Sequence, residues 1–147
     1  MLGEEKRSVS HKIVVGDADS LIALAYKDDA NHAKAKKVGA WLISKGYEVI
    51  YPNTAILEAI TALKRSMSLV DEAHLINSQY QAGAFLIEFV SEKVQQGASV
   101  RFEKAISKKN TIFDAVVAEV AVELEAEYIF SFDSWYVKEG FRLAPEK

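Results

Sequence analysis

The sequence predicts a single α/β domain in which helices cover both faces of a central, mostly parallel β-sheet, a three-layer α/β/α arrangement. Short runs of β-branched and aromatic residues alternate along the chain with longer segments of helical periodicity, as in βαβ units. These strand segments are apolar on both faces, which is typical of parallel strands buried between helix layers. The segment over residues 112–125 is apolar on nearly every side of a helix, so we expect it to lie in the core.

The expected elements follow one another without a linker, an internal repeat or a low-complexity segment. Apolar, β-branched runs predict strands over residues 13–15, 47–53, 127–132 and 141–144. Helical spacing predicts helices over residues 20–26, 31–45, 54–65, 102–108 and 112–125, and a helical region over residues 71–96 with a break near Gly83. We expect Thr54 to cap the helix that it begins, Gly46 to end the helix before it, and Gly97 to mark a loop.

Composition excludes several classes of protein. The 147 residues are 50% hydrophobic and 27% charged, which suits one soluble globular domain with a full core. The chain has no cysteine, which excludes disulfides and thiolate metal sites, and its net charge of -3 provides no general basic field for nucleic acid. No apolar run is long enough to span a membrane. We therefore expect a cytoplasmic protein that does not bind membranes, with a flexible extension over residues 1–12 that is not a signal peptide and a single domain over residues 13–147.

Five acidic residues are expected to gather at one edge of this sheet. The segment "VVGDADSLIAL" places Asp17 and Asp19 directly after the first strand. Asp133 follows the strand over residues 127–132, Asp114 begins the helix after residue 111, and Glu58 lies one turn into the helix after the second strand. In open parallel sheets, ligands bind outside the carboxyl ends of the strands. A single acid in such a place is ordinarily a helix cap or a solvated charge, but several at one edge indicate a site.

The chemistry of such a cluster favours a hard divalent cation. Clustered carboxylates repel one another and raise each other's pKa unless a cation lies between them. Mg²⁺ takes oxygen ligands, of which one or two are typically carboxylates. The three histidines, His11, His32 and His74, do not have the spacing of a zinc site. The sequence therefore predicts a centre for Mg²⁺ or Mn²⁺, ions that orient water and stabilise the leaving oxygen of a phosphodiester.

Four segments resemble the successive motifs of PIN-domain ribonucleases, particularly toxins of the VapC type: "VVGDADSLIAL", "YPNTAILEAITALKR", "TIFDAVVAEVAVELEAEYIFSFDSWY" and "GFRLA". The likeness runs from about residue 13 to residue 144. It implies a PIN-like α/β/α fold and metal-dependent hydrolysis of RNA, by an endonuclease rather than an exonuclease. Position by position, the family's catalytic and metal-binding acids match Asp17, Glu58, Asp114 and Asp133. Asp19 stands where the family often has a small polar residue, and it is a further expected metal ligand.

The resemblance also implies partners. RNA is the expected substrate, and Ser131, Arg65 and Asn53 are the candidate substrate-binding residues. A cytoplasmic ribonuclease toxin implies an antitoxin that covers the acidic cleft. We expect it to dock on the region over residues 54–89, whose Leu69, Leu75, Ile76 and Phe85 exceed what one helix needs for its own core face. The same apolar residues would also suit a symmetric homodimer or the core of the monomer.

Two alternatives remain open at the level of sequence. An Asp-x-Asp motif after the first strand also begins phosphatases of the haloacid-dehalogenase type, in which the first aspartate is a nucleophile and the second an acid and base. In this chain Ser20 and Leu21 follow the motif, whereas glycine, threonine or valine is usual in those phosphatases. The other alternative is a non-catalytic, PIN-like binding module that retains the acids. A phosphatase would hydrolyse a small phosphomonoester, whereas a PIN nuclease would cut RNA only with metal.

Overall fold

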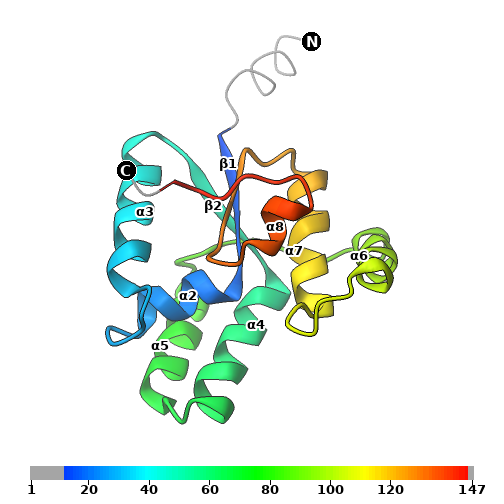
Figure 1. Ribbon diagram of the computed structural model, residues 1–147. Coiled ribbons are helices and arrows are strands. Elements are labelled where there is room, and N and C mark those ends of the chain that lie inside the picture. The colour runs from blue at the N-terminus through cyan, green and yellow to red at the C-terminus, as the bar shows by residue number, and fades with distance from the viewer. Residues whose placement is uncertain (1–11, 146–147) are drawn as a thin grey trace.

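The part of the chain that the structure describes is built around a four-stranded, fully parallel sheet (Figure 1). The computed structural model describes residues 12–145, so the extension expected over residues 1–12 lies almost entirely outside the described residues. The strand order is β3-β2-β1-β4, with each neighbouring pair parallel. The strands are β1 (Ile13–Gly16), β2 (Glu48–Pro52), β3 (Leu86–Glu88) and β4 (Tyr128–Phe130).

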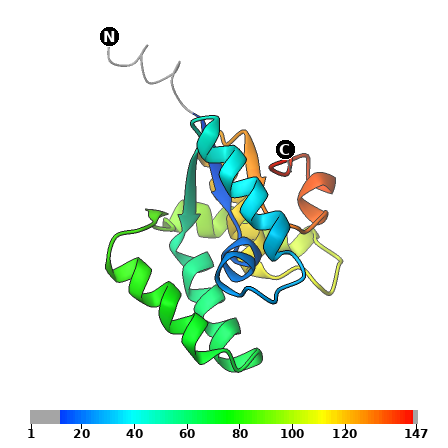
Figure 2. The same ribbon diagram turned by 90° about the vertical axis from the view of Figure 1, so that its left-hand side faces the viewer.

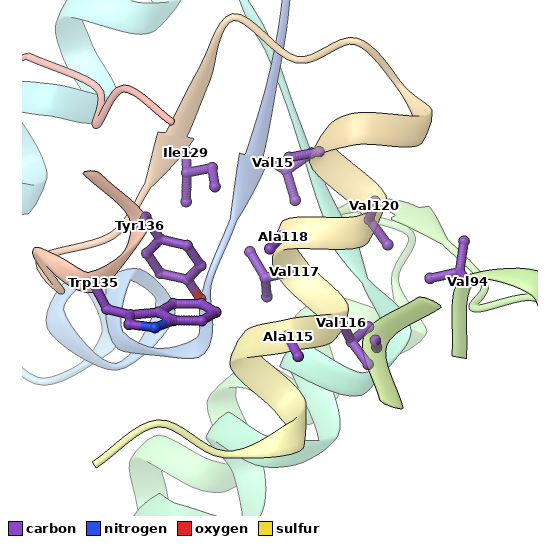
Figure 3. Packing of buried hydrophobic residues seen from close by; sticks show 12 residues of the cluster. Val15, Val94, Ala115, Val116, Val117, Ala118, Val120, Ile129, Trp135 and Tyr136 are labelled. Atoms are coloured by element: carbon purple, nitrogen blue, oxygen red, sulfur yellow. The ribbon is translucent and has the colours of Figure 1, made fainter. Parts of the chain in front are cut away.

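Helices cover both faces of the sheet, which gives the predicted three layers (Figures 1 and 2). Val14 of β1 faces one side and packs with residues of α2 (Ala18–Ala25) and α3 (His32–Ser44). Val15 faces the other side and packs with α6 (Glu92–Lys104), α7 (Ile112–Glu123) and α8 (Trp135–Lys138). Figure 3 shows this second cluster, in which Tyr136 and Trp135 lie beside Ile129 and the residues of α7. Successive side chains of a strand point to opposite faces, so one short strand anchors both layers.

A third group of helices extends beyond the carboxyl ends of β1 and β2 (Figure 1). It consists of α4 (Asn53–Thr61), a π-helical turn η1 (Ala62–Ser66) and α5 (Val70–Gln81). Ile56 and Leu63 on the first two of these elements pack against Ile76 of α5 and Leu21 of α2. The helix that carries Glu58 is therefore fixed against the same edge of the sheet from which Asp17 emerges.

The predicted strands and helices differ from the observed ones mainly between residues 82 and 110. The break at Gly83 is confirmed, with a φ of 76°. β3 was not predicted as a strand, since it is three residues long and exists because the edge of β2 supplies its pairing. The loop predicted at Gly97 is wrong, because Gly97 lies inside α6, where an added Cβ would come within 2.4 Å of Glu119 on α7. This glycine allows two helices to approach closely, which is a tertiary requirement that its local sequence does not reveal.

Three smaller predictions also need correction. The helix predicted over residues 102–108 is wrong, since α6 ends at Lys104 and no helix continues to residue 108. Thr54 does not cap α4, whose N-cap is Pro52; the hydroxyl of Thr54 is buried without a hydrogen-bond partner. The last predicted strand is reduced to a single parallel bridge between Ile129 and Leu143, because it borders only the three residues of β4.

We expect Gly16→Ala to lower the free energy of unfolding by about 1–3 kcal/mol, the usual cost of overpacking a core. A Cβ at residue 16 would lie 2.1 Å from Cε1 of Tyr51, whose ring is buried across the end of β1. Urea denaturation monitored by circular dichroism measures the change.

Gly39→Ala is the matched control, because nothing lies within 4 Å of its added Cβ and α3 is a helix. We expect the control to be neutral or stabilised by up to about 1 kcal/mol. Equal stability of the two variants would contradict the close approach of Tyr51 to β1.

Candidate active site

Asp17 is held at the carboxyl end of β1 by neutral hydrogen-bond donors. It is the N-cap of α2, and its Oδ1 accepts a hydrogen bond of 2.7 Å from the backbone N–H of Ala18. Its Oδ2 accepts one of 2.7 Å from the hydroxyl of Tyr136 and a longer one of 3.4 Å from Ser131. The carboxylate is only 4% exposed. Three donors therefore offset part of the cost of burying this carboxylate at the end of a core strand.

Asp19 lies one residue beyond the start of α2 and faces the loop after β4. Its Oδ2 accepts hydrogen bonds of 2.9 Å from the Ser131 hydroxyl and of 2.9 Å from the backbone N–H of Phe132. The Ser131 hydroxyl therefore lies within hydrogen-bond distance of both aspartates that follow β1. The other oxygen of Asp19, Oδ1, is buried and has no hydrogen-bond partner.

Asp114 and Asp133 share a donor that the sequence analysis missed. Asp114 forms a capping box with Thr111 at the start of α7, and its Oδ2 accepts a hydrogen bond of 2.9 Å from the backbone N–H of Thr111. The side-chain nitrogen of Asn110 lies 3.2 Å from this Oδ2 and 3.0 Å from Oδ2 of Asp133. Oδ1 of Asp133 accepts a hydrogen bond of 2.9 Å from the backbone N–H of Trp135. Asp114 is also linked to Asp17, because its Oδ1 lies 3.5 Å from the Tyr136 hydroxyl.

Glu58 lies near the other acids, since the charges of Asp114 and Asp19 act on its pKa. It lies on α4, and its Oε1 is buried without a hydrogen-bond partner. A pocket of about 300 Å³ opens beside it, between α4, η1 and the start of α7, and is lined by Leu57, Glu58, Thr61, Ala62, Ser66 and Phe113. Glu58 lies away from the apolar face of its helix: Ile56 and Leu63 are buried in the core, while Glu58 borders the pocket.

Burial and mutual repulsion raise the pKa of these carboxylates. The pKa of Asp17 is raised well above its usual value, first by burial and then by the charges of Asp19 and Asp114. Burial raises the pKa of Asp19 to about 6, against the effect of the donors at Phe132 and Ser131. The pKa of Glu58 rises to about 7, through burial and then the charges of Asp114 and Asp19. Burial also raises the pKa of Asp114. The donors described above are neutral, so the site carries negative charge that its own hydrogen bonds do not neutralise.

The donor set fits a hard cation better than it fits a purely structural network. The orphaned oxygens of Asp19 and Glu58 are acceptors of the type that Mg²⁺ and Mn²⁺ use. An unpaired buried carboxylate oxygen is costly, so a native fold retains it where a bound ion or water satisfies it, or where function requires it. Between residues 12 and 145, no three acidic or histidine side chains already stand in a metal-holding arrangement. The cluster therefore supplies the ligand types, and its side chains would have to adjust around an ion.

The structure sorts the predicted site residues into two groups. Shared donors link Asp17, Asp19, Asp114 and Asp133 to one another, with Ser131 among the donors, and Glu58 acts on this group through its charge. The two remaining candidates lie apart from these hydrogen bonds. Asn53 accepts a hydrogen bond of 2.8 Å from the backbone N–H of Val90, and Arg65 is exposed on η1.

Tyr136 and Asn110 are the site residues that sequence reasoning did not assign. Both act across long sequence separations: Tyr136 and Asp17 are 119 positions apart, and Asn110 and Asp133 are 23 positions apart. A polar residue just before the capping box of a helix that begins with an acid was the available signal for Asn110.

Comparisons with known proteins bear on the fold. No family model and no curated protein sequence matches the chain. Among solved structures, it is similar to VapC20 of Mycobacterium tuberculosis, a toxin that cleaves the sarcin-ricin loop, with a TM-score of 0.76. The alignment covers 87% of this chain and 95% of VapC20 at 21% sequence identity. The chain therefore has the PIN-like three-layer α/β/α fold that its sequence predicted.

Proposed function

We propose that this protein is a metal-dependent ribonuclease that hydrolyses phosphodiester bonds of RNA, as an endonuclease. The observation that carries the proposal is the cluster of buried acids, in which two oxygens have no partner and the surrounding donors are neutral. The structural similarity to VapC20, a toxin that cleaves the sarcin-ricin loop, supports the same reaction class. By the same likeness, a structured RNA loop is the first substrate to test.

Asp17, Asp19, Glu58, Asp114 and Asp133 are the residues that would hold Mg²⁺ or Mn²⁺. The bound ion would supply positive charge for the developing charge on the phosphate and increase the acidity of a nearby water. The chain itself orients the ligands: Tyr136 and Ser131 fix the carboxylates after β1, and Thr111 and Asn110 fix Asp114. Such outer contacts determine the orientation of ligand oxygens.

RNA would reach the cluster from the side of α4. Arg65, exposed on η1 two turns beyond Glu58, is the proposed phosphate contact. The Ser131 hydroxyl is a second proposed contact at the margin of the cluster. Asn53 uses its Oδ1 for the N–H of Val90, so its amide nitrogen is the atom that we propose for RNA. A π-helical turn beside a candidate site is a common feature of functional regions.

Two other functions compete with this proposal. A phosphatase of the haloacid-dehalogenase type would use Asp17 as nucleophile. Both oxygens of Asp17 are already hydrogen-bonded, because Oδ1 caps α2 and Oδ2 accepts a hydrogen bond from the Tyr136 hydroxyl. A non-catalytic module would keep the fold without turnover. Incubation with p-nitrophenyl phosphate and with a mixed RNA pool, each with and without Mn²⁺, separates the three functions. We expect cleavage of RNA only, and only with the ion.

We expect Asp17→Asn and Asp114→Asn each to reduce RNA cleavage by more than about 100-fold while the fold is kept. Even changes to residues that only orient metal ligands cost about 10- to 100-fold. Stability should hold or rise, because each change removes one repelling charge from the cluster. Asp28→Asn is the matched control, since Asp28 is exposed in the turn after α2 and makes none of the hydrogen bonds described for the cluster. Wild-type cleavage by both variants would exclude this site, and a large drop in melting temperature would make the acids structural.

We expect the metal-free protein to lose stability as pH rises from about 4 to about 7, and Mn²⁺ to restore it above that range. The folded-state pKa values of Glu58 and Asp19, about 7 and about 6, exceed their usual values of 4.5 and 3.8. The folded state therefore binds more protons than the unfolded state in this window, and deprotonation favours unfolding by at most about 1.4 kcal/mol per unit of pKa difference.

Urea denaturation at several pH values, with EDTA or with Mn²⁺, measures this effect. Glu58→Gln isolates the contribution of one group, because the variant should lose less stability between pH 5 and pH 7.5 than the wild type. The melting temperature should respond to Mn²⁺ at pH 7.5 and respond less at pH 5, where protons compete for the carboxylates. An identical pH dependence of wild type and variant would contradict the raised pKa of Glu58.

We also propose that an antitoxin covers this site. The pocket beside Glu58 has apolar walls at Leu57 and Phe113, which are 59% and 38% exposed. An amphipathic helix that ends in arginine or lysine would fill such a pocket and neutralise the acids. The docking residues predicted from sequence need revision, because Ile76 is buried in the core and Leu69 and Phe85 pack against it. Of those four, Leu75 is the exposed one, at 45%.

We expect the protein encoded by the neighbouring gene to co-purify with this chain and to suppress its RNA cleavage. Mass measurement in solution distinguishes that complex from a homodimer formed through the same apolar surface. A monomer that neither binds the neighbouring protein nor is inhibited by it would remove the antitoxin from the proposal and leave the nuclease.

Between residues 12 and 145, no helix combines the length and hydropathy needed to cross a bilayer.

A further inference from the structure

The five acids differ in how their oxygens are satisfied. Asp19 and Glu58 each keep a buried oxygen without a partner, and Oδ1 of Asp114 has only the 3.5 Å contact from Tyr136. Asp133 is different, since its Oδ1 accepts from the backbone of Trp135 and its Oδ2 accepts from Asn110. The unsatisfied oxygens therefore belong to the part of the cluster between α2, α4 and α7, whereas Asp133 is held on both oxygens.

The contact between Asp114 and Asp133 is made through one nitrogen atom. Nδ2 of Asn110 lies 3.2 Å from Oδ2 of Asp114 and 3.0 Å from Oδ2 of Asp133. Both carboxylates are acceptors, so the amide must turn its NH₂ group toward them, and its two N–H bonds serve one carboxylate each. Asn110 is itself 7% exposed, so this bridge is shielded from water.

We infer that Asn110 makes this a one-ion centre, because its NH₂ group bridges Asp114 and Asp133 where a second divalent cation would have to bind. The inference rests on the proposed metal-dependent function. Mg²⁺ holds its oxygen ligands at about 2.0–2.1 Å. An ion bound to both carboxylate oxygens would therefore need the space that the Asn110 nitrogen occupies, and the two cannot be present together. One ion remains for Asp17, Asp19, Glu58 and Asp114, which narrows the proposed set of five acids by Asp133, whose two oxygens are already hydrogen-bonded. Asn110 is a positioning residue, since it acts through the carboxylates that it joins.

The position of Asn110 in the fold explains how the amide is kept in place. Asn110 directly precedes Thr111, the N-cap of α7, whose backbone N–H also donates to Oδ2 of Asp114. The capping box therefore fixes the backbone from which the amide reaches Asp133 across 23 residues of sequence. The bond to Asp114 stays within the start of α7, whereas the bond to Asp133 reaches the loop after β4. The second bond, to Asp133, is the one that occupies the gap between the acids.

Counting bound Mn²⁺ tests the inference without any RNA. The full chain, stripped with EDTA, is titrated with Mn²⁺ and followed by calorimetry, and the free ion is counted by electron paramagnetic resonance. We expect one Mn²⁺ per wild-type chain and two per chain for Asn110→Ala, in which the gap is open. Thr111→Ala is the matched control: it weakens the start of the same helix, leaves the amide bridge, and should bind one Mn²⁺.

The outcomes separate this inference from the proposed function. Two Mn²⁺ per wild-type chain, together with metal-dependent RNA cleavage, would overturn the role of Asn110 and leave the nuclease intact. One Mn²⁺ per chain in Asn110→Ala would also overturn it. If Asn110→Ala does not fold, Asn110→Ser supplies the test, since its hydroxyl has a single proton and a shorter reach and cannot bridge both acids; it should bind two. Absence of Mn²⁺ binding by the wild type would overturn the inference and the proposed metal dependence together.

Discussion

The hydrogen bond from Tyr136 to Asp17 joins the two ends of the domain at the point where the site is formed. The tyrosine is fully buried on α8, its ring packs edge-on against Trp135, and its hydroxyl lies 2.7 Å from the carboxylate that follows β1. Burial and the neighbouring charges of Asp17 and Asp114 raise the pKa of Tyr136, so it stays protonated and donates. Without this donor, a carboxylate that is 4% exposed would lose its shortest side-chain hydrogen bond.

The buried acids at this edge of the sheet lower the stability of the fold. The same edge of the sheet that receives β1, β4 and the start of α7 also concentrates acids whose pKa values are raised by burial and repulsion. A core selected for stability alone would fill that edge with apolar residues, as the clusters around Val14 and Val15 do on the two faces. Functional sites commonly retain such unfavourable groups because their chemistry requires them.

Local patterns in the sequence were sufficient to predict the frame of the domain and the edge at which the acids meet. The strand at residues 13–15, the helix at residues 31–45 and the buried helix after Thr111 each carry their own periodicity and end signals, and the structure contains all three. The acids could be placed because each lies next to the end of a strand or the start of a helix. The donors that join them could not be placed, since Tyr136, Ser131 and Asn110 reach their partners only after the chain has folded.

Where prediction failed, a neighbouring element had determined the local structure. Gly97 has the composition of a loop residue, yet it lies in a helix because α6 packs closely on Glu119 of α7. Thr54 has the side chain of a helix cap, yet its hydroxyl is buried without a partner while the preceding proline takes the cap position. β3 exists because β2 offers a pairing edge.

The cluster has a fixed side and an adjustable side, and this division follows from the elements that carry the acids. Asp17, Asp19, Asp114 and Asp133 are each held by at least one backbone N–H, at helix starts or at the loop after β4. Glu58 extends from the middle of α4, where backbone N–H groups are already used within the helix, and its Oε1 has no partner. It also has one more rotatable bond than the aspartates and borders the 300 Å³ pocket. Any cation or ligand that enters the site would therefore be accommodated by movement of Glu58 first, against four aspartates that the backbone keeps in place.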